Sequence, residues 1–256
     1  MDLYGAMNQI LENKKQEKKD AESQAVINYQ QLLLKLSEST GRGDEEKAEE
    51  YARTAISIIK DYNFPHMEAL IYYLLYSMYV SVNGNNRKIE ETLDKAIELS
   101  KEAVEKNIAG SRMTCCQYLV TKANTFFFNK KFNNALQLYS EALDISKKDC
   151  AAELQISIYQ MIGTCKRIAG DFDSWEAFVN GWKIVEKLGE KEIKNQVILR
   201  YYAKEMLKTG SSKERAEYEK RFALFWGEDW QEQIVNHEKE NRKKTSVFST
   251  GNISVN

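Results

Sequence analysis

Pairs of small residues spaced seven apart recur along this chain at a nearly constant interval. The pairs are Ala48 and Ala55, Ala96 and Ala103, Ala135 and Ala142, and Ala216 and Ala223, and a further place in the same register holds Trp175 and Trp182. The leading positions of the five pairs are 48, 39, 40 and 41 residues apart. A spacing of seven returns to the same face of a helix, and small residues let two helices approach closely. The pattern therefore predicts a stack of about five helical repeats.

Helix-breaking residues are scarce and lie between the repeats. The chain has one proline, Pro65, and 12 glycines, which fits long helices joined by short turns. Pro65 suits the first turn of a helix, where its missing N–H costs nothing. The expected helix pairs are 22–39 with 44–61, 66–82 with 88–106, 112–128 with 132–147, 152–169 with 172–187, and 191–208 with 212–225. A helix near 2–19 is expected either to run into the first repeat or to cap it.

Residues 116–149 carry the repeat pattern most clearly. Two helical stretches flank a turn at 129–131, and the recurring small and large residues are Leu119, Ala123, Phe126, Phe132, Ala135, Tyr139 and Ala142. This arrangement resembles the tetratricopeptide repeat (TPR), a helix–turn–helix of about 34 residues with small residues at fixed sites. Two positions depart from the family pattern: Lys122 replaces a leucine and Lys147 a proline. The resemblance implies an all-α fold, a right-handed α-solenoid of about five antiparallel helix pairs.

The resemblance also divides the chain. Residues 1–21 are expected to form an N-terminal capping helix, 22–230 the repeat domain, and 231–256 the end of the last helix and a flexible polar tail that is either disordered or docks on a partner. In the fourth repeat, Trp175 and Trp182 occupy the two small sites, so we expect them to push neighbouring helices apart and to mark either a weak point or a docking surface.

In proteins that this chain resembles, the first helix of each repeat lines a concave groove that binds a partner. The matching positions predict a partner-binding set on three helices: Leu74, Met78, Val120, Asn124, Phe127, Phe128, Gln160, Thr164 and Arg167. Exposed aromatic side chains would supply anchoring area, and amides would bond a peptide backbone. An equally weighted alternative is that Phe127 and Phe128 only pack against the neighbouring repeat.

Catalytic and metal chemistry is not favoured by the sequence. Cys115, Cys116, Cys150 and Cys165 form no CxxC pair, and the chain has only two histidines, so neither a zinc site nor a cysteine nucleophile with its base is expected. The acidic run 44–50 is interpreted as a solvated helix start, where carboxylates oppose the helix dipole. We therefore expect no catalytic residue, no cofactor and no enzyme activity.

Charge and hydropathy narrow the class of partner. The net charge of -1 gives no field for nucleic acid, and no run of about 18 apolar residues predicts membrane insertion. Without a signal peptide, the cysteines are expected to be thiols in the cytoplasm. We expect a protein-interaction module that binds a protein or peptide: an adaptor, chaperone, scaffold or assembly factor of a larger complex, possibly a secretion apparatus. The alternative is a peptide-sensing regulator that changes shape on binding a small peptide.

Overall fold

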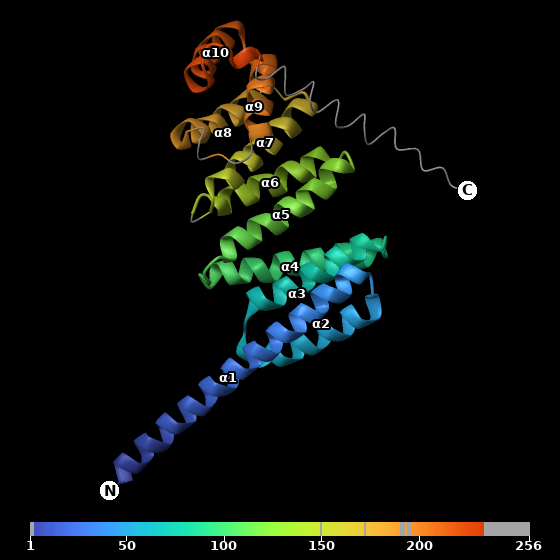
Figure 1. Cartoon of the computed structure of the whole chain (residues 1–256), viewed down its shortest axis with the longest axis vertical. Helices are drawn as coiled ribbons and strands as arrows, with labels where there is room; N and C mark the ends of the chain where they lie inside the picture. The colour runs from blue at the N-terminus through green and yellow to red at the C-terminus, as the bar shows by residue number, and fades with distance from the viewer. Residues whose placement is uncertain (1–2, 149, 172, 190–192, 194–195, 233–256) are drawn as a thin grey trace, which may run out of the picture. The chain divides into compact units, whose positions relative to one another are not determined.

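The fold is a series of helix pairs. The computed structural model describes residues 3–148, 150–171, 173–189, 193 and 196–232, and every regular element in that part of the chain is a helix (Figure 1). The pairs are α1 (Leu3–Arg42) with α2 (Glu45–Ile59), α3 (Pro65–Ser81) with α4 (Asn86–Glu105), α5 (Ser111–Phe128) with α6 (Phe132–Ser146), α7 (Ala152–Ile168) with α8 (Ser174–Leu188), and α9 (Gln196–Thr209) with α10 (Ser212–Trp226). A short 3-10 helix, η1 (Lys60–Tyr62), follows α2, and Pro65 opens α3 as predicted.

The chain divides into two compact units. The first unit is Met1–Lys122 and the second is Ala123–Asn256, so the division falls within α5. The first has a core built from α1, α2 and α3 around Leu36, Ile59 and Ile71. The second has a larger, aromatic core from α7, α8, α9 and α10 around Phe178 and Trp182. Each unit is described separately below.

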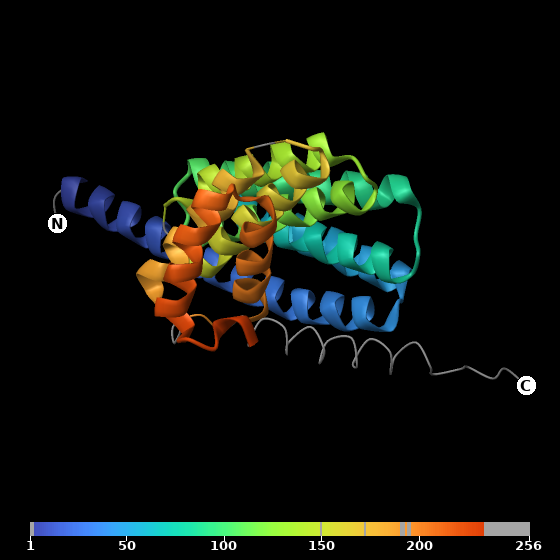
Figure 2. The ribbon, with the colours of Figure 1, turned by 90° about the horizontal axis from the view of Figure 1, so that it is seen from above.

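In the first unit, α1 is one uninterrupted helix. It has 40 residues, which corresponds to about 60 Å, whereas its partner α2 has 15. The segment 1–21 therefore continues into the first repeat helix, and the N-terminal half of α1 projects past the other helices of the unit (Figure 1, Figure 2). Residues 15–20 on this projection are all exposed. The predicted tail, by contrast, falls almost entirely at 233–256, outside the described residues.

The recurring alanines lie where helices meet, with one exception. Ala48, Ala55, Ala96, Ala103, Ala135 and Ala142 have no exposed surface, which confirms three of the four predicted alanine pairs. The pair at Ala216 and Ala223 is only half confirmed: Ala223 is half-buried against the aromatic core, but Ala216 is exposed, and α10 mainly buries Tyr218, Phe222 and Trp226. Burying three aromatic side chains removes far more apolar surface from water than burying two methyl groups, so the aromatic face of α10 turns inward.

The tryptophans of the fourth repeat are accommodated by glycines that sequence reasoning overlooked. Trp182 is fully buried on α8 and packs against Phe222 of α10, with ring centroids 4.8 Å apart. A Cβ at Gly181 would lie 2.0 Å from Oη of Tyr202, and one at Gly210 would lie 2.8 Å from the ring of Trp175. The usual pattern of small residues is therefore inverted here. Trp175 and Trp182 occupy the two sites that are usually small. The small residues are instead Gly181, which lies against the ring of Tyr202, and Gly210, which lies against the ring of Trp175.

The first helices of four pairs end in the same backbone motif. Gly43, Asn83, Lys130 and Gly170 all have positive φ after the C-termini of α1, α3, α5 and α7. At each one, its N–H bonds a carbonyl three residues back, and the next N–H bonds a carbonyl five residues back, as in Lys130 to Phe127 and Lys131 to Phe126. This is the Schellman arrangement, which satisfies carbonyls that a helix end leaves open. The four positive-φ residues are equivalent and fix the register of the repeats.

Lys130 is the one cap residue of the four that is neither glycine nor asparagine, and it has φ 60. A side chain with Cβ is disfavoured in that conformation. Lys130→Gly should therefore raise the free energy of unfolding by about 0.5–1 kcal/mol, measured by chemical denaturation. The reverse change, Gly170→Lys, should lower it by about 1 kcal/mol, since nothing lies within 4 Å of a Cβ there and only the backbone is strained. Equal stability of all three proteins would contradict the shared cap.

Candidate partner-binding surface

The predicted set on α5 contains one freely presented aromatic side chain. Phe128 is 79% exposed. Phe127 is half-buried, and its ring meets that of Phe132, the first residue of α6, edge to face at 5.6 Å. The two phenylalanines thus take different roles: Phe127 packs within its own repeat, while Phe128 is available to a partner. Asn124 is also committed in part, because its Oδ1 accepts a hydrogen bond from Tyr139 of α6.

The predicted residues of α7 contact the next first helix, α9. Thr164 is buried, and its Oγ1 lies 2.9 Å from Oη of Tyr201. Arg167 is exposed, and its Nε lies 2.6 Å from Oε2 of the buried Glu205. That oxygen accepts no well-aligned hydrogen bond, so the contact with Arg167 is an ion pair and not a directional hydrogen bond. These two bridges join α7 to α9, and Gln160 lies half-buried one turn before Thr164.

In the first unit, the predicted positions on α3 are shifted by one residue. Met78 has no exposed surface, and Leu74 packs against the same core cluster, so Met78 presents nothing to a partner. Asn124 and Thr164 each lie six residues before their cap residues, and the sixth residue before Asn83 is Ser77. By the same count Tyr73, and not Leu74, is equivalent to Val120 and Gln160.

Tyr73 was therefore missed by sequence reasoning, although its contacts place it on the surface shared by first helices. Its ring stacks on Tyr118 of α5 with centroids 4.3 Å apart, and both residues lie in the first unit. Val120, predicted for the same surface, is half-buried on α5. The turn residue indicates the register. Counting back ten and six residues from Asn83 gives Tyr73 and Ser77.

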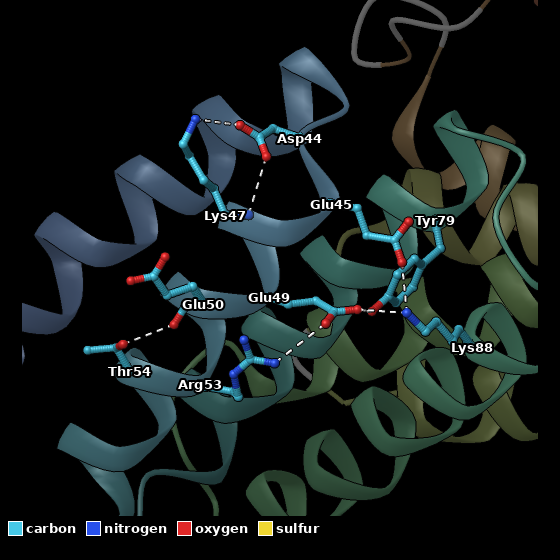
Figure 3. A network of polar contacts seen from close by, with 9 residues as sticks. All are labelled: Asp44, Glu45, Lys47, Glu49, Glu50, Arg53, Thr54, Tyr79 and Lys88. Carbon is cyan, nitrogen blue, oxygen red and sulfur yellow. Dashed lines mark hydrogen bonds and ion pairs between the residues drawn. The ribbon is translucent and has the colours of Figure 1, made fainter.

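On the second helices of the first unit, a polar network joins α2, α3 and α4 (Figure 3). Oη of Tyr79 donates to Oε1 of Glu49 at 2.6 Å, and Nζ of Lys88 donates to the same oxygen at 2.8 Å and to Oε1 of Glu45 at 2.7 Å. Asp44 is the N-cap of α2, and its Oδ1 accepts from the N–H of Lys47. The acidic run 44–50 is thus a helix start as predicted, but Glu49 turns inward and ties three helices together.

These contacts shift the ionisation of the residues that make them. Hydrogen bonds from Lys88 and Tyr79 hold the pKa of the Glu49 carboxyl below its usual value of 4.5. Burial, with the bond to Glu49, raises the pKa of Tyr79 to about 12. Glu49 and Lys88 therefore stay charged and Tyr79 neutral across the physiological range, which suits a structural clasp and not an acid–base pair that exchanges protons near pH 7.

Glu49→Gln should lower the free energy of unfolding at pH 7 by about 1–2 kcal/mol, because a charged acceptor of two hydrogen bonds is lost. The pKa of Glu49 is depressed in the folded state. Its contribution to the free energy of unfolding is therefore present above about pH 4.5 and is lost as the pH falls through the pKa of the folded state. The difference between wild type and variant should thus shrink toward zero in denaturation at about pH 3. Glu50→Gln, on the exposed side of α2, is the control. A difference that persists at low pH would contradict the clasp.

The described residues offer little for catalysis or metal binding. Burial raises the pKa of the Cys165 thiol to about 11, so its thiolate is scarce at neutral pH, and Cys115 and Cys116 are buried. No group of three or more His, Cys, Asp or Glu in the described part of the chain is placed to hold a metal ion. Of the helices described, none has the length and apolar character needed to cross a bilayer.

Comparison with known proteins rests on structure. No family model matches the sequence, and no curated protein matches it. BtubC (BKLC) from P. vanneervenii is similar in structure with a TM-score of 0.53 and 18% identity, over 99% of this chain and 93% of that one. The apo form of RapI has a TM-score of 0.56 and 16% identity, over 93% and 71%. A putative kinesin light chain with TPR-like repeats from Podosopora anserina has a TM-score of 0.51 and 12% identity, over 83% and 95%.

The chain is a TPR-like α-solenoid. At these identities the likeness establishes the fold alone. The TPR-like frame explains why α1, α3, α5, α7 and α9 carry equivalent positions, and why the caps at Asn83, Lys130 and Gly170 predict them.

Proposed function

We propose that this TPR-like chain is a non-catalytic interaction module that binds a protein or peptide segment along its first helices. The carrying observation is a set of exposed apolar side chains just before the repeat caps: Val80, Phe128 and Ile168 are 45%, 79% and 43% exposed. Phe128 and Ile168 both lie two residues before their caps, Lys130 and Gly170, and Val80 lies three residues before Asn83. A side chain such as Phe128, left in water at the place that Ile168 holds in the next repeat, is the kind of anchor that a partner buries.

Polar groups beside these anchors would fix the register of the partner. Arg167 directly precedes Ile168 and is exposed. Its planar guanidinium can donate hydrogen bonds to the carbonyl and carboxylate groups of a partner. Gln160 adds an amide one turn away from Thr164. We name Phe128, Gln160, Arg167 and Ile168 the first-helix surface of the second unit. In the first unit, Tyr73 and Ser77 hold the positions equivalent to Gln160 and Thr164, in place of the expected Leu74 and Met78, and the exposed Val80 is equivalent to Arg167.

The role we favour is that of an adaptor, chaperone or assembly factor in the cytoplasm. Residues that would serve covalent or metal chemistry are absent from the described first-helix surface, and Cys150 and Cys165 carry free thiols, which fits a reducing compartment. An adaptor needs a stable shape, and the clasp at Glu49 supplies rigidity within the first unit. The partner itself is to be found by experiment.

A second role is favoured by the bridges between α7 and α9. Arg167 and Thr164 contact Glu205 and Tyr201 on the side where we place the partner. A ligand that takes up the Arg167 guanidinium would release Glu205 and change how the two helices meet, which would make the chain a peptide-sensing regulator. Spin labels at Ala169 and Val197, two exposed positions at the ends of α7 and α9, distinguish the roles: an unchanged distance on partner binding supports an adaptor, and a shift supports a sensor.

The experiment that tests the proposal is purification from the native host under mild conditions, with co-purifying chains identified by mass spectrometry. Phe128→Ser removes the main anchor, together with its edge-to-face ring contact at 5.7 Å with the half-buried Phe127. Leu224→Ser is the matched control, because Leu224 is 87% exposed on a second helix, α10. We expect a partner that is retained by wild type and by Leu224→Ser and lost with Phe128→Ser. Retention by all three proteins would place binding elsewhere.

A further inference from the structure

A crevice on the second helices of the first unit is lined by residues other than Tyr73, Ser77 and Val80, the first-helix positions of the same unit. It has a volume of about 340 Å³ and opens between α2 and α4 over α3. Its floor is apolar, from Ala52, Ile56 and Leu75, and two phenol rings, Tyr72 and Tyr79, stand along it. The volume is in the range of sites that hold small ligands or single large side chains, about 300–1,000 Å³. An apolar floor with charged rims suits a side chain with a long stem and a charged head.

One end of the crevice already binds a cation from the chain itself. Nζ of Lys88 lies 2.7 Å from Oε1 of Glu45, 2.8 Å from Oε1 of Glu49, and 5.0 Å from the ring centroid of Tyr79 (Figure 3). A cation between carboxylates and over an aromatic face is stabilised by both. Lys88 thus shows which chemistry the walls recognise.

The lining also includes an acid and a cation whose ion pairs are loosely held. The side chain of Glu91 is 61% exposed and pairs with Arg87, whose side chain is 83% exposed. Arg53 is 70% exposed and reaches Glu49 only at 3.5 Å. Exposed ion pairs of this kind contribute little to stability, so a partner's cation can replace either one. The half-buried phenol of Tyr72 belongs to the same lining.

The charge of the surrounding helices selects the sign of the partner. The two helices α2 and α4 carry four and six acidic residues against two and four basic ones, which leaves an excess of four negative charges. A basic partner is therefore drawn to this face. Arginine fits better than lysine, because its planar guanidinium stacks on a tyrosine ring while it bonds a carboxylate.

We propose that the crevice between α2 and α4 is a second binding site, which takes an arginine side chain from a basic, amphipathic partner segment. The stem would lie on Ile56 and Leu75, and the guanidinium would bond Glu91 beside the Tyr72 ring. The site shares no residue with the first-helix positions Tyr73, Ser77 and Val80 of the same unit.

The test is a titration of the ¹⁵N-labelled full chain, followed by amide chemical shifts. The probes are the peptide acetyl-Leu-Arg-Leu-amide and its isostere with citrulline, which has the shape of arginine without the charge. The arginine peptide should give saturable shifts at Ile56, Tyr72 and Glu91. We expect the citrulline peptide, or Glu91→Gln, to weaken binding by about three-fold or more.

Two further variants make the result specific. Arg87→Ala removes the cation that pairs with Glu91 and should tighten binding of the arginine peptide by about two-fold. Glu102→Gln, an acidic residue of the same helix outside the crevice lining, should have no effect. Equal binding of the two peptides, an unchanged affinity in Glu91→Gln, or a loss in Glu102→Gln equal to that in Glu91→Gln would overturn the proposal.

Discussion

Trp182→Ala is expected to lower the free energy of unfolding of the second unit by about 3–5 kcal/mol, as for other large-to-small changes at buried aromatic residues. The Trp182 side chain has no exposed surface. Its ring meets Phe222, Phe225 and Trp226 at centroid distances of 4.8, 5.3 and 5.4 Å, and its Nε1 donates to Glu186 at 3.0 Å. The change would empty the space between α8 and α10.

Hydrogen exchange of individual amides measures this loss where it occurs. Because stacked repeats are stabilised mainly by their neighbours, protection should fall in α8 and α10, while amides of α3 in the first unit keep theirs. Leu224→Ala, on the exposed side of α10, should change stability by less than about 0.5 kcal/mol. A loss below about 1 kcal/mol for Trp182→Ala would contradict a tightly packed aromatic core.

Gly181→Ala is expected to be nearly as damaging, although it adds a single methyl group. The new Cβ would lie 2.0 Å from Oη and 2.6 Å from ring carbons of Tyr202. Tyr202 is fully buried and its hydroxyl donates to the carbonyl of Ile156, so it has nowhere to move. Overpacking typically costs about 1–3 kcal/mol and occasionally more. Because the Tyr202 ring cannot move, we expect a loss of about 3 kcal/mol, which denaturant unfolding of the purified variant would measure.

The same substitution elsewhere has the opposite sign. At Gly41, within α1, nothing lies within 4 Å of a Cβ, so Gly41→Ala should stabilise by up to about 1 kcal/mol through helix propensity. Adding Tyr202→Phe to Gly181→Ala removes the nearest clashing atom and should recover part of the loss. If Gly181→Ala were neutral, α8 and α9 would not approach as closely as the structure places them.

Much of the fold was accessible from the sequence because the repeat is written in local signals. Turn residues and the seven-residue spacing predicted the bounds of α2, α3, α4, α5, α6, α7, α8 and α10 within two residues. Whether the helix near 2–19 runs into the first repeat or caps it was left open by the sequence, because no helix-breaking residue separates residues 20 and 22. The buried face of α10 was predicted incorrectly, because an alanine pair was given more weight than Tyr218, Phe222 and Trp226, which bury more surface.

The candidate surface was less predictable than the fold. Residues near a clear cap, such as Phe128 and Arg167, were assigned to the surface and are exposed there. From Ala69 to Val80, α3 is apolar or aromatic except at Ser77, so hydropathy gave little indication of which face is buried, and Met78 was chosen where the count from the cap gives Ser77. Contacts between repeats, such as Arg167 with Glu205 and Glu49 with Lys88, join residues 38 and 39 positions apart. No local pattern encodes such pairings.

The central claim is that partners bind the first helices, and the affinity of a purified partner for surface variants tests it most directly. Titration calorimetry would compare wild type, Phe128→Ser and Leu224→Ser, each folded by circular dichroism. We predict that Phe128→Ser raises Kd by about ten-fold or more, the loss of one anchor of at least about 1.4 kcal/mol, and that Leu224→Ser stays within about two-fold. An unchanged Kd for Phe128→Ser, or an equal loss in Leu224→Ser, would contradict the claim.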